Sequence, residues 1–410
     1  MADMDVEVFR EMIRRGEVDR LVLQRIAHGA GVEFFALKCS IEHRLLPAER
    51  ELHRLTLVTG ISSLEYKLLL GVMDASVRQV LQDHATHIAG LAGEGPSSAE
   101  QSPIPKKAFG TKLGRLYQCD CMQLMPSMDP DSVDLVFADP PFNLDKMYPS
   151  GMDDDLKACE YIRWSEGWLR ECVRVLKPGG SLFVWNLPKW NMQLATFLNQ
   201  HLTFRHWIAV DIKYSLPIAG RLYPSHYSLL YYCKGPKAKA FHPDRLPMPV
   251  CPHCSGDLRD YGGYKNKMNP NGVNLADVWT DIPPVRHAKY KRRKDANELS
   301  VRLLDRIVEM ASDEGDLVFD PFGGSGTTYA VSEIKARRWV GCEIGPVDEI
   351  VARFAALAEE RAYLQRIRSD LNCLFTARTL ALRQQNGLWT VESVRGSQQE
   401  EPSDLFSFAG

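Results

Sequence analysis

From residue 116 onward, short apolar runs alternate with longer segments of helical periodicity, and this alternation restricts the fold more than any other feature of the chain. Strands separated by helical segments form parallel sheets with helical crossovers. The runs that read as buried strands are Val133–Ala138, Ser181–Trp185, Leu317–Phe319 and Trp339–Cys342. The pattern predicts an α/β fold with a mostly parallel, doubly wound sheet, in which ligands bind at the carboxyl ends of the strands.

The helices expected between these strands have clear boundaries. An amphipathic segment runs from Leu156 to Leu176 and is stopped by the Lys177-Pro178-Gly179-Gly180 sequence. A second apolar helix face consists of Leu299, Leu303, Leu304, Ile307 and Val308.

The N-terminal part of the chain has a different pattern of apolar residues. Residues 5–92 carry apolar positions at three- to four-residue steps, which predicts a small helical module without recognisable chemistry. A small, polar, proline-containing stretch follows, which is typical of a linker. The expected organisation is a helical module (1–92), a linker (93–110), a large α/β domain (111–385) interrupted by an irregular insertion (about 236–296), and a C-terminal tail (386–410).

Composition sets limits on the kind of protein. The 410 residues are 45% hydrophobic and 25% charged with a net charge of −2, so any nucleic-acid binding must come from a local basic surface. The ten cysteines lack the regular spacing of a disulfide framework, and the N-terminus is acidic where a secretory signal would be basic and then apolar. Both features favour a reducing, cytoplasmic environment. No apolar run is long enough to predict a membrane span.

A glycine-rich stretch after the Leu317–Phe319 strand is the first candidate binding site. Glycine lets the backbone approach a ligand closely and accepts positive φ. An acid at the end of the next strand, Glu343, is placed to accept hydrogen bonds from the two hydroxyls of a ribose. The combination predicts a nucleoside-cofactor site, whereas the glycines alone are explained equally well by a tight turn. The stretch reads Asp320, Pro321, Phe322, Gly323, Gly324, Ser325, Gly326, Thr327 and Thr328.

The second candidate site is the Asp139-Pro140-Pro141-Phe142 sequence, which follows the Val133–Ala138 strand. The Asp139 carboxylate and the Pro140 carbonyl form an acceptor pair that can hold both N–H groups of an exocyclic amine and orient its nitrogen. Pro140 and Pro141 stiffen the loop, and Phe142 can stack on a base that has left its helix. The alternative interpretation is a strand-ending turn, which aspartate and proline both favour.

The order of the two sites, amine site first and cofactor loop second, resembles the permuted beta class of DNA amino-methyltransferases. The resemblance covers residues 113–365 and implies a Rossmann-like domain that transfers a methyl group from S-adenosyl-L-methionine to DNA. It further implies that Asp120 reads the cofactor adenine and that Asn297 contacts its methionine carboxylate, although the sequence around Asn297 departs from the commoner family form. Aspartate at position 139 is more frequent in adenine-N6 than in cytosine-N4 enzymes of this class.

The resemblance leaves other functions open. Cytosine-N4 methylation would use the same residues, and a non-catalytic DNA-binding subunit could retain the fold. The long insertion fits duplex DNA better than an RNA substrate. Protein-glutamine methylation is less consistent with the sequence, because related enzymes usually carry asparagine where Asp139 stands. The partners implied are double-stranded DNA, a second copy of the chain in a homodimer, and a cognate restriction endonuclease.

Two features of the insertion bear on ligands. A basic run predicts phosphate contacts, with a solvated loop as the alternative; its cationic residues are Arg286, Lys289, Lys291, Arg292, Arg293 and Lys294. Cys251 and Cys254 have the spacing of a zinc knuckle, but four ligands are needed and no second pair follows, so a cysteine-flanked turn is the favoured alternative to structural zinc.

Overall fold

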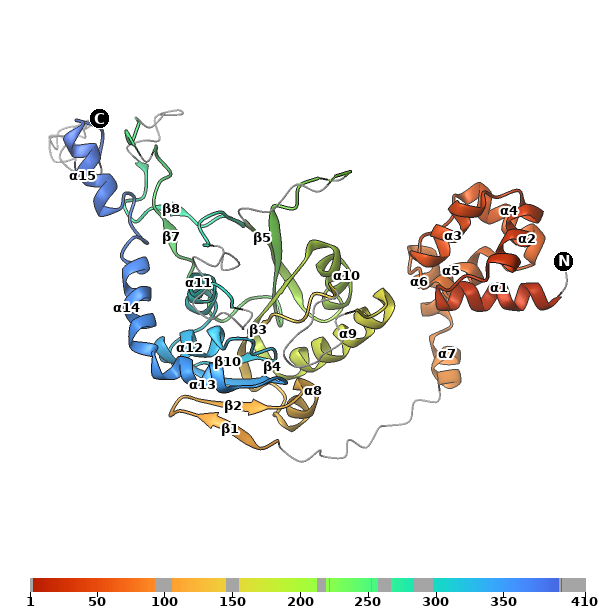
Figure 1. Ribbon diagram of the computed structural model, residues 1–410, viewed down its shortest axis with the longest axis horizontal. Helices are drawn as coiled ribbons and strands as arrows, with labels where there is room; N and C mark the ends of the chain where they lie inside the picture. Colours follow the sequence, from red (N-terminus) through yellow and green to blue (C-terminus); the bar gives the residue numbers. More distant parts are fainter. Residues whose placement is uncertain are drawn as a thin grey trace, which may run out of the picture. The chain divides into compact units, whose positions relative to one another are not determined.

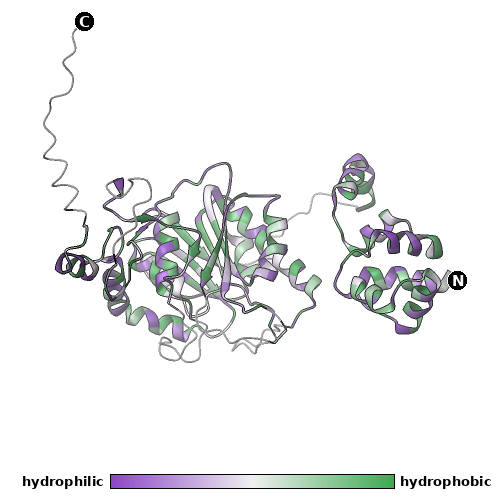
Figure 2. Cartoon of the chain, turned by 90° about the horizontal axis from the view of Figure 1, so that it is seen from above, coloured by the Kyte–Doolittle hydropathy of each residue, from purple (hydrophilic) through white to green (hydrophobic). Residues whose placement is uncertain are grey.

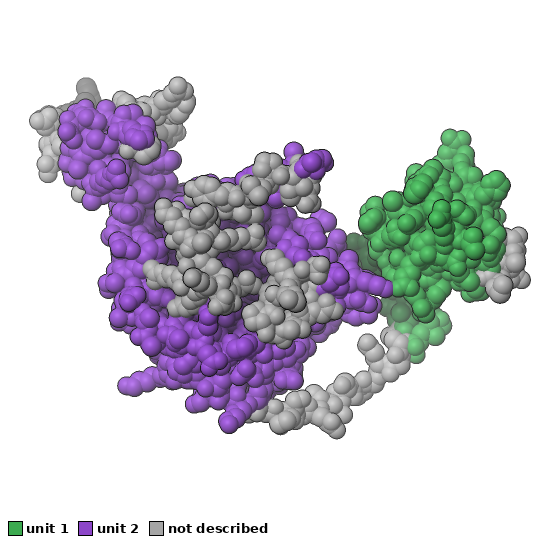
Figure 3. All heavy atoms as spheres, viewed as in Figure 1, with its two compact units in different colours: residues 1–100 green, residues 101–410 purple. Residues whose placement is uncertain are grey.

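The computed structural model describes residues 3–92, 105–144, 155–211, 219–220, 222–251, 253–256, 267–283, 298–390 and 392. It divides into two compact units, Met1–Glu100 and Gln101–Gly410 (Figure 3). Within the described ranges no helix is long and apolar enough to cross a membrane. All ten cysteines are free thiols.

The first unit consists of short helices around a core of their own. The side chain of Asp19 accepts the N–H groups of Leu21 and Val22 at the start of the second helix, and Gly31 ends that helix in a left-handed conformation. Buried side chains such as Phe9 and Ile26 form the core. The helices are α1 (Asp3–Arg15), α2 (Arg20–Ala30), α3 (Phe34–Glu42), α4 (Glu49–Thr59), α5 (Ser63–Leu70), α6 (Ala75–Asp83) and α7 (Ala85–Ala92).

The second unit is built on a nine-stranded sheet with the strand order β1-β2-β11-β10-β3-β4-β6-β5-β9 (Figure 1). Its strands are β1 (Lys107–Gly110), β2 (Gly114–Gln118), β3 (Val133–Ala138), β4 (Leu176–Asn186), β5 (Thr203–Asp211), β6 (His226–Cys233), β9 (Val278–Trp279), β10 (Leu317–Asp320) and β11 (Arg338–Glu343). The strands β7 (Arg245–Leu246) and β8 (Val273–Asn274) form a separate small sheet.

Helices cover both faces of the large sheet, as predicted for a doubly wound fold. They are α8 (Cys121–Leu124), α9 (Ala158–Val175), α10 (Pro188–Leu198), α11 (Val301–Ala311), α12 (Thr327–Ile334), α13 (Asp348–Ala355) and α14 (Leu357–Arg368), with a 3₁₀ turn η1 (Met125–Ser127) after α8. The second unit also contains α15 (Ala377–Gln385), which lies away from the large sheet (Figure 1).

The two faces follow from the alternation of side chains along each strand. In β3, Val136 and Ala138 pack with residues of α9 and α10, whereas Leu135 and Phe137 pack with residues of α11 and α14. All six residues of β3 are buried, which is typical of a central parallel strand. Figure 2 shows the hydrophobic colouring concentrated in these strands. The predicted α/β class with a mostly parallel sheet is confirmed.

Five adjacent strands, β2, β11, β10, β3 and β4, run parallel to one another. Their carboxyl ends therefore lie at one edge of the sheet. The residues that close or directly follow these strands are Gln118, Glu343, Asp320, Asp139 and Asn186. Both candidate motifs are thus brought to the same edge although they are far apart in the sequence.

Two expected boundaries are wrong. The linker was expected to extend to residue 110, but residues 107–110 form β1, an antiparallel edge strand whose backbone pairs with β2. The tail was expected to begin at residue 386, but the Leu388 N–H donates to the Arg383 carbonyl and the Arg383 side chain donates to the Trp389 carbonyl. Both segments are short, and their contacts are local: β1 forms a hairpin with β2, and Arg383 contacts residues five and six positions later.

Candidate functional site

The two motifs meet at the neighbouring strands β10 and β3. Val318 lies opposite Leu135 and Phe319 opposite Val136, so Asp320 and the Asp139 loop leave the sheet side by side. Burial raises the pKa of Asp320 well above its ordinary value, and the nearby Asp139 carboxylate contributes to the same shift. The two aspartates therefore interact electrostatically across the boundary between the motifs.

The glycine loop adopts the conformation for which glycine was expected. Gly324 and Gly326 have φ values of 51° and 72°, in the left-handed region. A Cβ on Gly323 would lie 2.9 Å from the Tyr329 hydroxyl oxygen and 3.0 Å from the Cys342 carbonyl oxygen, so a larger residue would displace the loop. The Gly326 N–H closes the turn on the Gly323 carbonyl at 2.7 Å. The loop is a tight strand-to-helix turn that leads into α12.

Glu343 links this loop to the end of β11. One carboxylate oxygen accepts the Gly324 N–H at 2.7 Å, and the other accepts the Gly345 N–H at 2.8 Å. Burial raises the pKa of Glu343, and the N–H groups of Gly345, Gly324 and Ile344 counteract part of this shift. The side chain is only partly covered, so a carboxylate with two fixed N–H partners is presented at the strand end. It has the chemistry to accept two hydroxyl groups of a ligand.

Asp320 supports the loop from inside. It is 2% exposed, and its oxygens accept the Phe322 N–H at 2.9 Å and the Thr328 hydroxyl at 2.5 Å. The Phe322 ring packs edge-on against Trp168 of α9 at a centroid distance of 5.1 Å. Asp320 therefore positions the loop, and its burial leaves little of its carboxylate open to a ligand.

An ion pair that the sequence did not suggest holds the far side of the loop. Arg353 of α13 is fully buried, and it pairs with the buried Glu360 of α14 at 2.9 Å. The same guanidinium donates to the Ser325 carbonyl at 3.1 Å and to the Thr327 hydroxyl at 2.8 Å. A rigid, charged clamp thus fixes the last turn of the glycine loop.

Asp120 lies beside Glu343 at the same edge. The Cys119 N–H donates to the Glu343 carbonyl at 3.0 Å, which places the segment after β2 against the end of β11. The Asp120 carboxylate accepts the Met122 N–H at 2.8 Å and is the N-cap of α8. Asp120 therefore caps the start of α8, and its contact with an adenine stays a prediction.

The Asp139 loop is held by side chains from two helices. The Tyr161 hydroxyl of α9 donates to the Pro141 carbonyl at 2.7 Å, and the Trp190 Nε1–H of α10 donates to the Phe142 carbonyl at 2.7 Å. The amide of Asn186, at the end of β4, donates to the Tyr161 hydroxyl at 2.9 Å. These contacts fix the carbonyl groups that follow Asp139, so the loop is preorganised without a ligand.

The side chains of the loop itself differ in exposure. Pro140 is buried, and Asp139 and Pro141 are partly exposed. Phe142 is 8% exposed, and its ring packs against Tyr227 at a centroid distance of 5.8 Å. The ring is part of the core in this structure, so its stacking on a base stays a prediction.

Several predicted site residues lie outside the described residues. They are Asn297 and the basic residues Arg286, Lys289, Lys291, Arg292, Arg293 and Lys294. Nothing in the structure places them relative to the two motifs.

The zinc prediction is tested only at its two cysteines. Cys251 and Cys254 are exposed at a turn, where the N–H groups of Cys254 and His253 lower the pKa of the Cys251 thiol. Cys233 and His242 could serve as further zinc ligands by residue type. Cys233 is buried in β6, however, and His242 contacts Asp313 at 2.9 Å. Within the described ranges no three His, Cys, Asp or Glu side chains gather as metal ligands would.

The sequence interpretation missed the residues that support the site, chiefly Tyr161, Trp190, Arg353 and Glu360. Asn186 could have been found, because it directly follows a predicted strand next to the Asp139 strand. The others lie on helices whose sequences indicate only an amphipathic pattern. Their contacts are with residues of other elements, which such a pattern does not predict.

Comparisons with known proteins agree with this geometry. Residues 133–351 match the model of a family described as DNA methylase. The type II methyltransferase M.BamHI of Bacillus amyloliquefaciens is 45% identical over 381 residues, which cover 90% of each chain. The DNA adenine methyltransferase YhdJ of Escherichia coli (strain K12) is 30% identical over 58% of this chain and 80% of its own. A solved structure titled PvuII DNA methyltransferase (cytosine-N4-specific) has 18% identity and a TM-score of 0.47, and covers 63% of this chain and 94% of its own.

Proposed function

The chain belongs to the DNA methylase family of N6/N4 methyltransferases, and from this premise we propose that it transfers a methyl group from S-adenosyl-L-methionine to the N6 amine of adenine at a particular short sequence in duplex DNA. The single observation that carries the proposal is the placement of Asp139 and of the Asp320–Thr327 loop at the ends of the adjacent strands β3 and β10. An amine acceptor and a nucleoside-binding turn are then close enough to serve one reaction.

The amine would be held by Asp139 and Pro140. The exocyclic nitrogen of a base donates its two N–H groups to the Asp139 carboxylate and the Pro140 carbonyl, which draws its lone pair out of the ring and toward the methyl carbon. When bound, S-adenosyl-L-methionine would supply the methyl group from its sulfonium, whose S–C bond would break as the N–C bond forms. The Asp139 carboxylate would take up the proton that leaves the nitrogen. The target base must leave the duplex for this, because its amine is otherwise paired.

The cofactor would lie along the glycine loop. Glu343 is proposed to accept the ribose hydroxyls, and the backbone of Phe322, Gly323 and Gly324 to line the nucleoside. Ser325, Gly326 and Thr327 form the turn that the Arg353 clamp holds. Asp120 is proposed to read the adenine amine of the cofactor, and Asn297 its carboxylate.

Cytosine N4 is the second candidate target. The same acceptor pair serves either amine, and the family description covers both bases. Adenine is favoured by the aspartate at position 139 and by the 30% identity with a protein whose name states adenine. The 45% identity with a type II methyltransferase supports a role in restriction-modification, with a cognate endonuclease as partner.

Product analysis tests the proposal. Unmethylated plasmid DNA is incubated with the protein and labelled S-adenosyl-L-methionine and then digested to nucleosides. Label in N6-methyl-2′-deoxyadenosine supports the proposal, and label in N4-methyl-2′-deoxycytidine retains the mechanism but changes the base. Cofactor binding without label in DNA contradicts the proposal.

Replacing Tyr161 with phenylalanine is expected to lower the kcat of methyl transfer about 5- to 10-fold, because it removes one hydrogen bond to the Asp139 loop and leaves the Asn186 amide unpaired. Cofactor affinity should not change, since the Pro141 carbonyl and the Asn186 amide that the Tyr161 hydroxyl contacts lie on the amine side. Steady-state kinetics and calorimetric cofactor titration check this. Tyr232→Phe is the matched control, because its hydroxyl contacts Asn199 instead; equal losses in both variants would refute a positioning role.

Cofactor affinity is expected to fall as the solution becomes acidic. Ribose hydroxyls donate to the ionised Glu343, so binding is strong above its pKa and weakens as the pH falls through it. Because burial raises that pKa, the weakening should begin above the ordinary range of a glutamate. The stability of the ligand-free protein depends on pH in the opposite direction. Because the folded-state pKa of Glu343 is raised, its contribution to stability is lost as the pH rises through that pKa.

Titration of S-adenosyl-L-methionine between about pH 5 and pH 8 checks this dependence. Glu343→Gln should bind the cofactor more weakly, by about 10-fold or more, with the acid dependence removed. A wild-type affinity that does not change over this range would contradict the role of Glu343.

A further inference from the structure

The C-terminal segment is joined to the insertion by backbone hydrogen bonds. The Asn372 N–H donates to the Arg245 carbonyl at 2.9 Å, and the Met248 N–H donates to the Leu374 carbonyl at 2.8 Å. The Leu374 N–H in turn donates to the Pro270 carbonyl at 2.8 Å. Figure 1 shows α15 beside β7 and β8, at the far end of the insertion. Residues 369–390 and the described residues of the insertion within 244–256 and 267–274 therefore form one structural element, which we call the C-terminal lobe.

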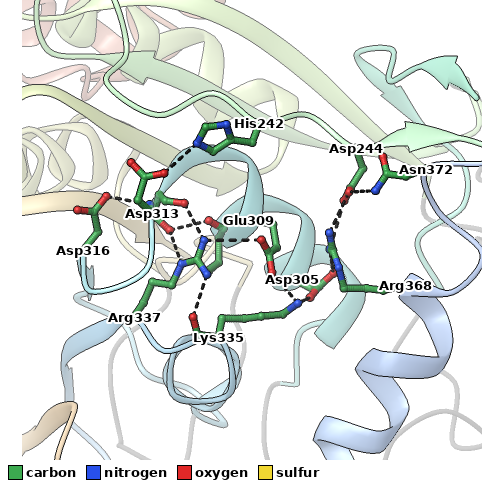
Figure 4. Close-up of polar contacts among 12 residues, drawn as sticks. His242, Asp244, Asp305, Glu309, Asp313, Asp316, Lys335, Arg337, Arg368 and Asn372 are labelled. Carbon is green, nitrogen blue, oxygen red and sulfur yellow. Dashed lines mark hydrogen bonds and ion pairs between the residues drawn. The ribbon is translucent and has the colours of Figure 1, made fainter. Parts of the chain in front are cut away.

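A buried ion network attaches this lobe to the sheet domain. Arg368, at the end of α14, donates to Asp244 of the insertion at 2.9 Å and to Asp305 of α11 at 2.7 Å (Figure 4). Asp244 and Asp305 are 6% and 1% exposed, so both carboxylates need charge compensation. Arg368 bridges the two, and Lys335 pairs with Asp305 at 2.9 Å as well. The orientation of the lobe is thereby fixed relative to the helix α11 that packs on the sheet.

The helix α15 is fixed within the lobe by its inner face. Arg383 is fully buried, and it donates to the Ser255 carbonyl at 2.5 Å and to the Gly256 carbonyl at 3.1 Å. Its guanidinium lies 4.6 Å from the centroid of the Phe375 ring. The turn that contains Cys251 and Cys254 is thus held against α15.

The outer face of α15 has no protein partner in the described part of the chain. Five residues of α15 are exposed, and at about 100° per residue they fall within an arc of about 120°, on the side away from Arg383. Gln384 lies at one edge of this arc, and the other four form what we call the outer face: Ala377, Arg378, Ala381 and Gln385. Residues 371–391 include no Asp or Glu, and Arg378 makes no ion pair with a described residue. Gln384 is engaged, since its amide donates to Glu392 at 3.0 Å.

We propose that the outer face of α15 binds duplex DNA and contributes to the choice of the methylated sequence; this inference rests on the proposed function. Two alanines allow the helix to approach a groove closely. Arg378 and Gln385 carry the guanidinium and the amide that hydrogen-bond to phosphates and to the edges of guanine and adenine. The DNA contacts expected from the sequence lie in the basic run of the insertion, whereas α15 comes from the other end of the domain.

The double variant Arg378→Ala/Gln385→Ala tests this. The KM for DNA is expected to rise at least about 10-fold, with cofactor affinity unchanged. The slope of the logarithm of the DNA-binding constant against the logarithm of the salt concentration should decrease in magnitude by about one, as for the loss of one phosphate contact. Sequencing of the methylated positions should show relaxed selection at one or more base pairs. Arg361→Ala, which removes an exposed arginine from α14, is the control and should leave these values unchanged.

The outcomes separate the inference from the proposed function. Wild-type KM and site selection in the double variant would overturn the inference while methylation stands. A changed oligomeric state with unchanged DNA affinity would also overturn it, because the face would then contact a second copy. No methyl transfer to DNA by the wild type would overturn the proposed function itself, and the inference with it.

Discussion

Replacing Asp139 with alanine is expected to lower the kcat of methyl transfer by about 10²- to 10⁴-fold. The variant loses the charged acceptor of the amine, and the Pro140 carbonyl alone cannot hold both N–H groups. The loop should keep its shape, because the Tyr161 hydroxyl and the Trp190 Nε1–H still hold the Pro141 and Phe142 carbonyls. Single-turnover kinetics at saturating DNA and cofactor measure the chemical step directly.

Two further variants delimit this result. Asp139→Asn retains one acceptor oxygen of similar shape and should lose less activity than the alanine variant. Asp131→Ala removes an exposed aspartate near the opposite end of β3, where it pairs with Lys234 at 2.7 Å, and should leave kcat unchanged. A kcat for Asp139→Ala within about threefold of wild type would contradict the assignment of the amine site.

Replacing Arg353 with methionine is expected to lower the free energy of unfolding by about 3–5 kcal/mol, because it leaves the carboxylate of Glu360 buried without its partner. Cofactor affinity should fall as well, since the Ser325 carbonyl and the Thr327 hydroxyl lose their shared donor. Denaturant unfolding gives the first quantity and calorimetric titration the second.

The variant Arg353→Met/Glu360→Leu separates the two effects. It removes both charges, so most of the lost stability should return, whereas the glycine loop still lacks its clamp and cofactor affinity stays low. Recovery of both quantities in the double variant would contradict a direct role of Arg353 in holding the loop. A loss below about 1 kcal/mol in the single variant would contradict the buried ion pair itself.

The sequence was sufficient to predict the central part of the sheet. Val133–Ala138 was predicted and found as β3 with the same bounds, because a run of six buried residues closed by aspartate and prolines has few alternatives. The glycine loop was equally accessible, since the left-handed conformations of Gly324 and Gly326 require glycine. Both motifs were therefore placed correctly at the carboxyl edge.

The supporting contacts were not predictable in the same way. Tyr161 and Arg353 lie on helices whose sequences indicate only which face is buried. Tyr161 contacts Pro141, which is 20 residues away, and Arg353 contacts Ser325, which is 28 residues away. The role of residues 369–390 depends on hydrogen bonds with Arg245, Met248 and Ser255, more than a hundred residues earlier. No local sequence pattern encodes such pairings, because residues 369–390 and the segments that they contact each have the sequence of an ordinary coil or helix.

The most direct test of the central claim, that one sheet edge joins the amine site to the cofactor loop, is a single-turnover transfer from S-adenosyl-L-methionine carrying a deuterated methyl group to unmethylated duplex DNA, with mass analysis of the nucleosides. We expect the deuterated methyl group on an exocyclic amine, at N6 of adenine, with no such product from Asp139→Ala. A methyl group on a ring carbon of the base, or no label in DNA although the cofactor binds, would contradict the account.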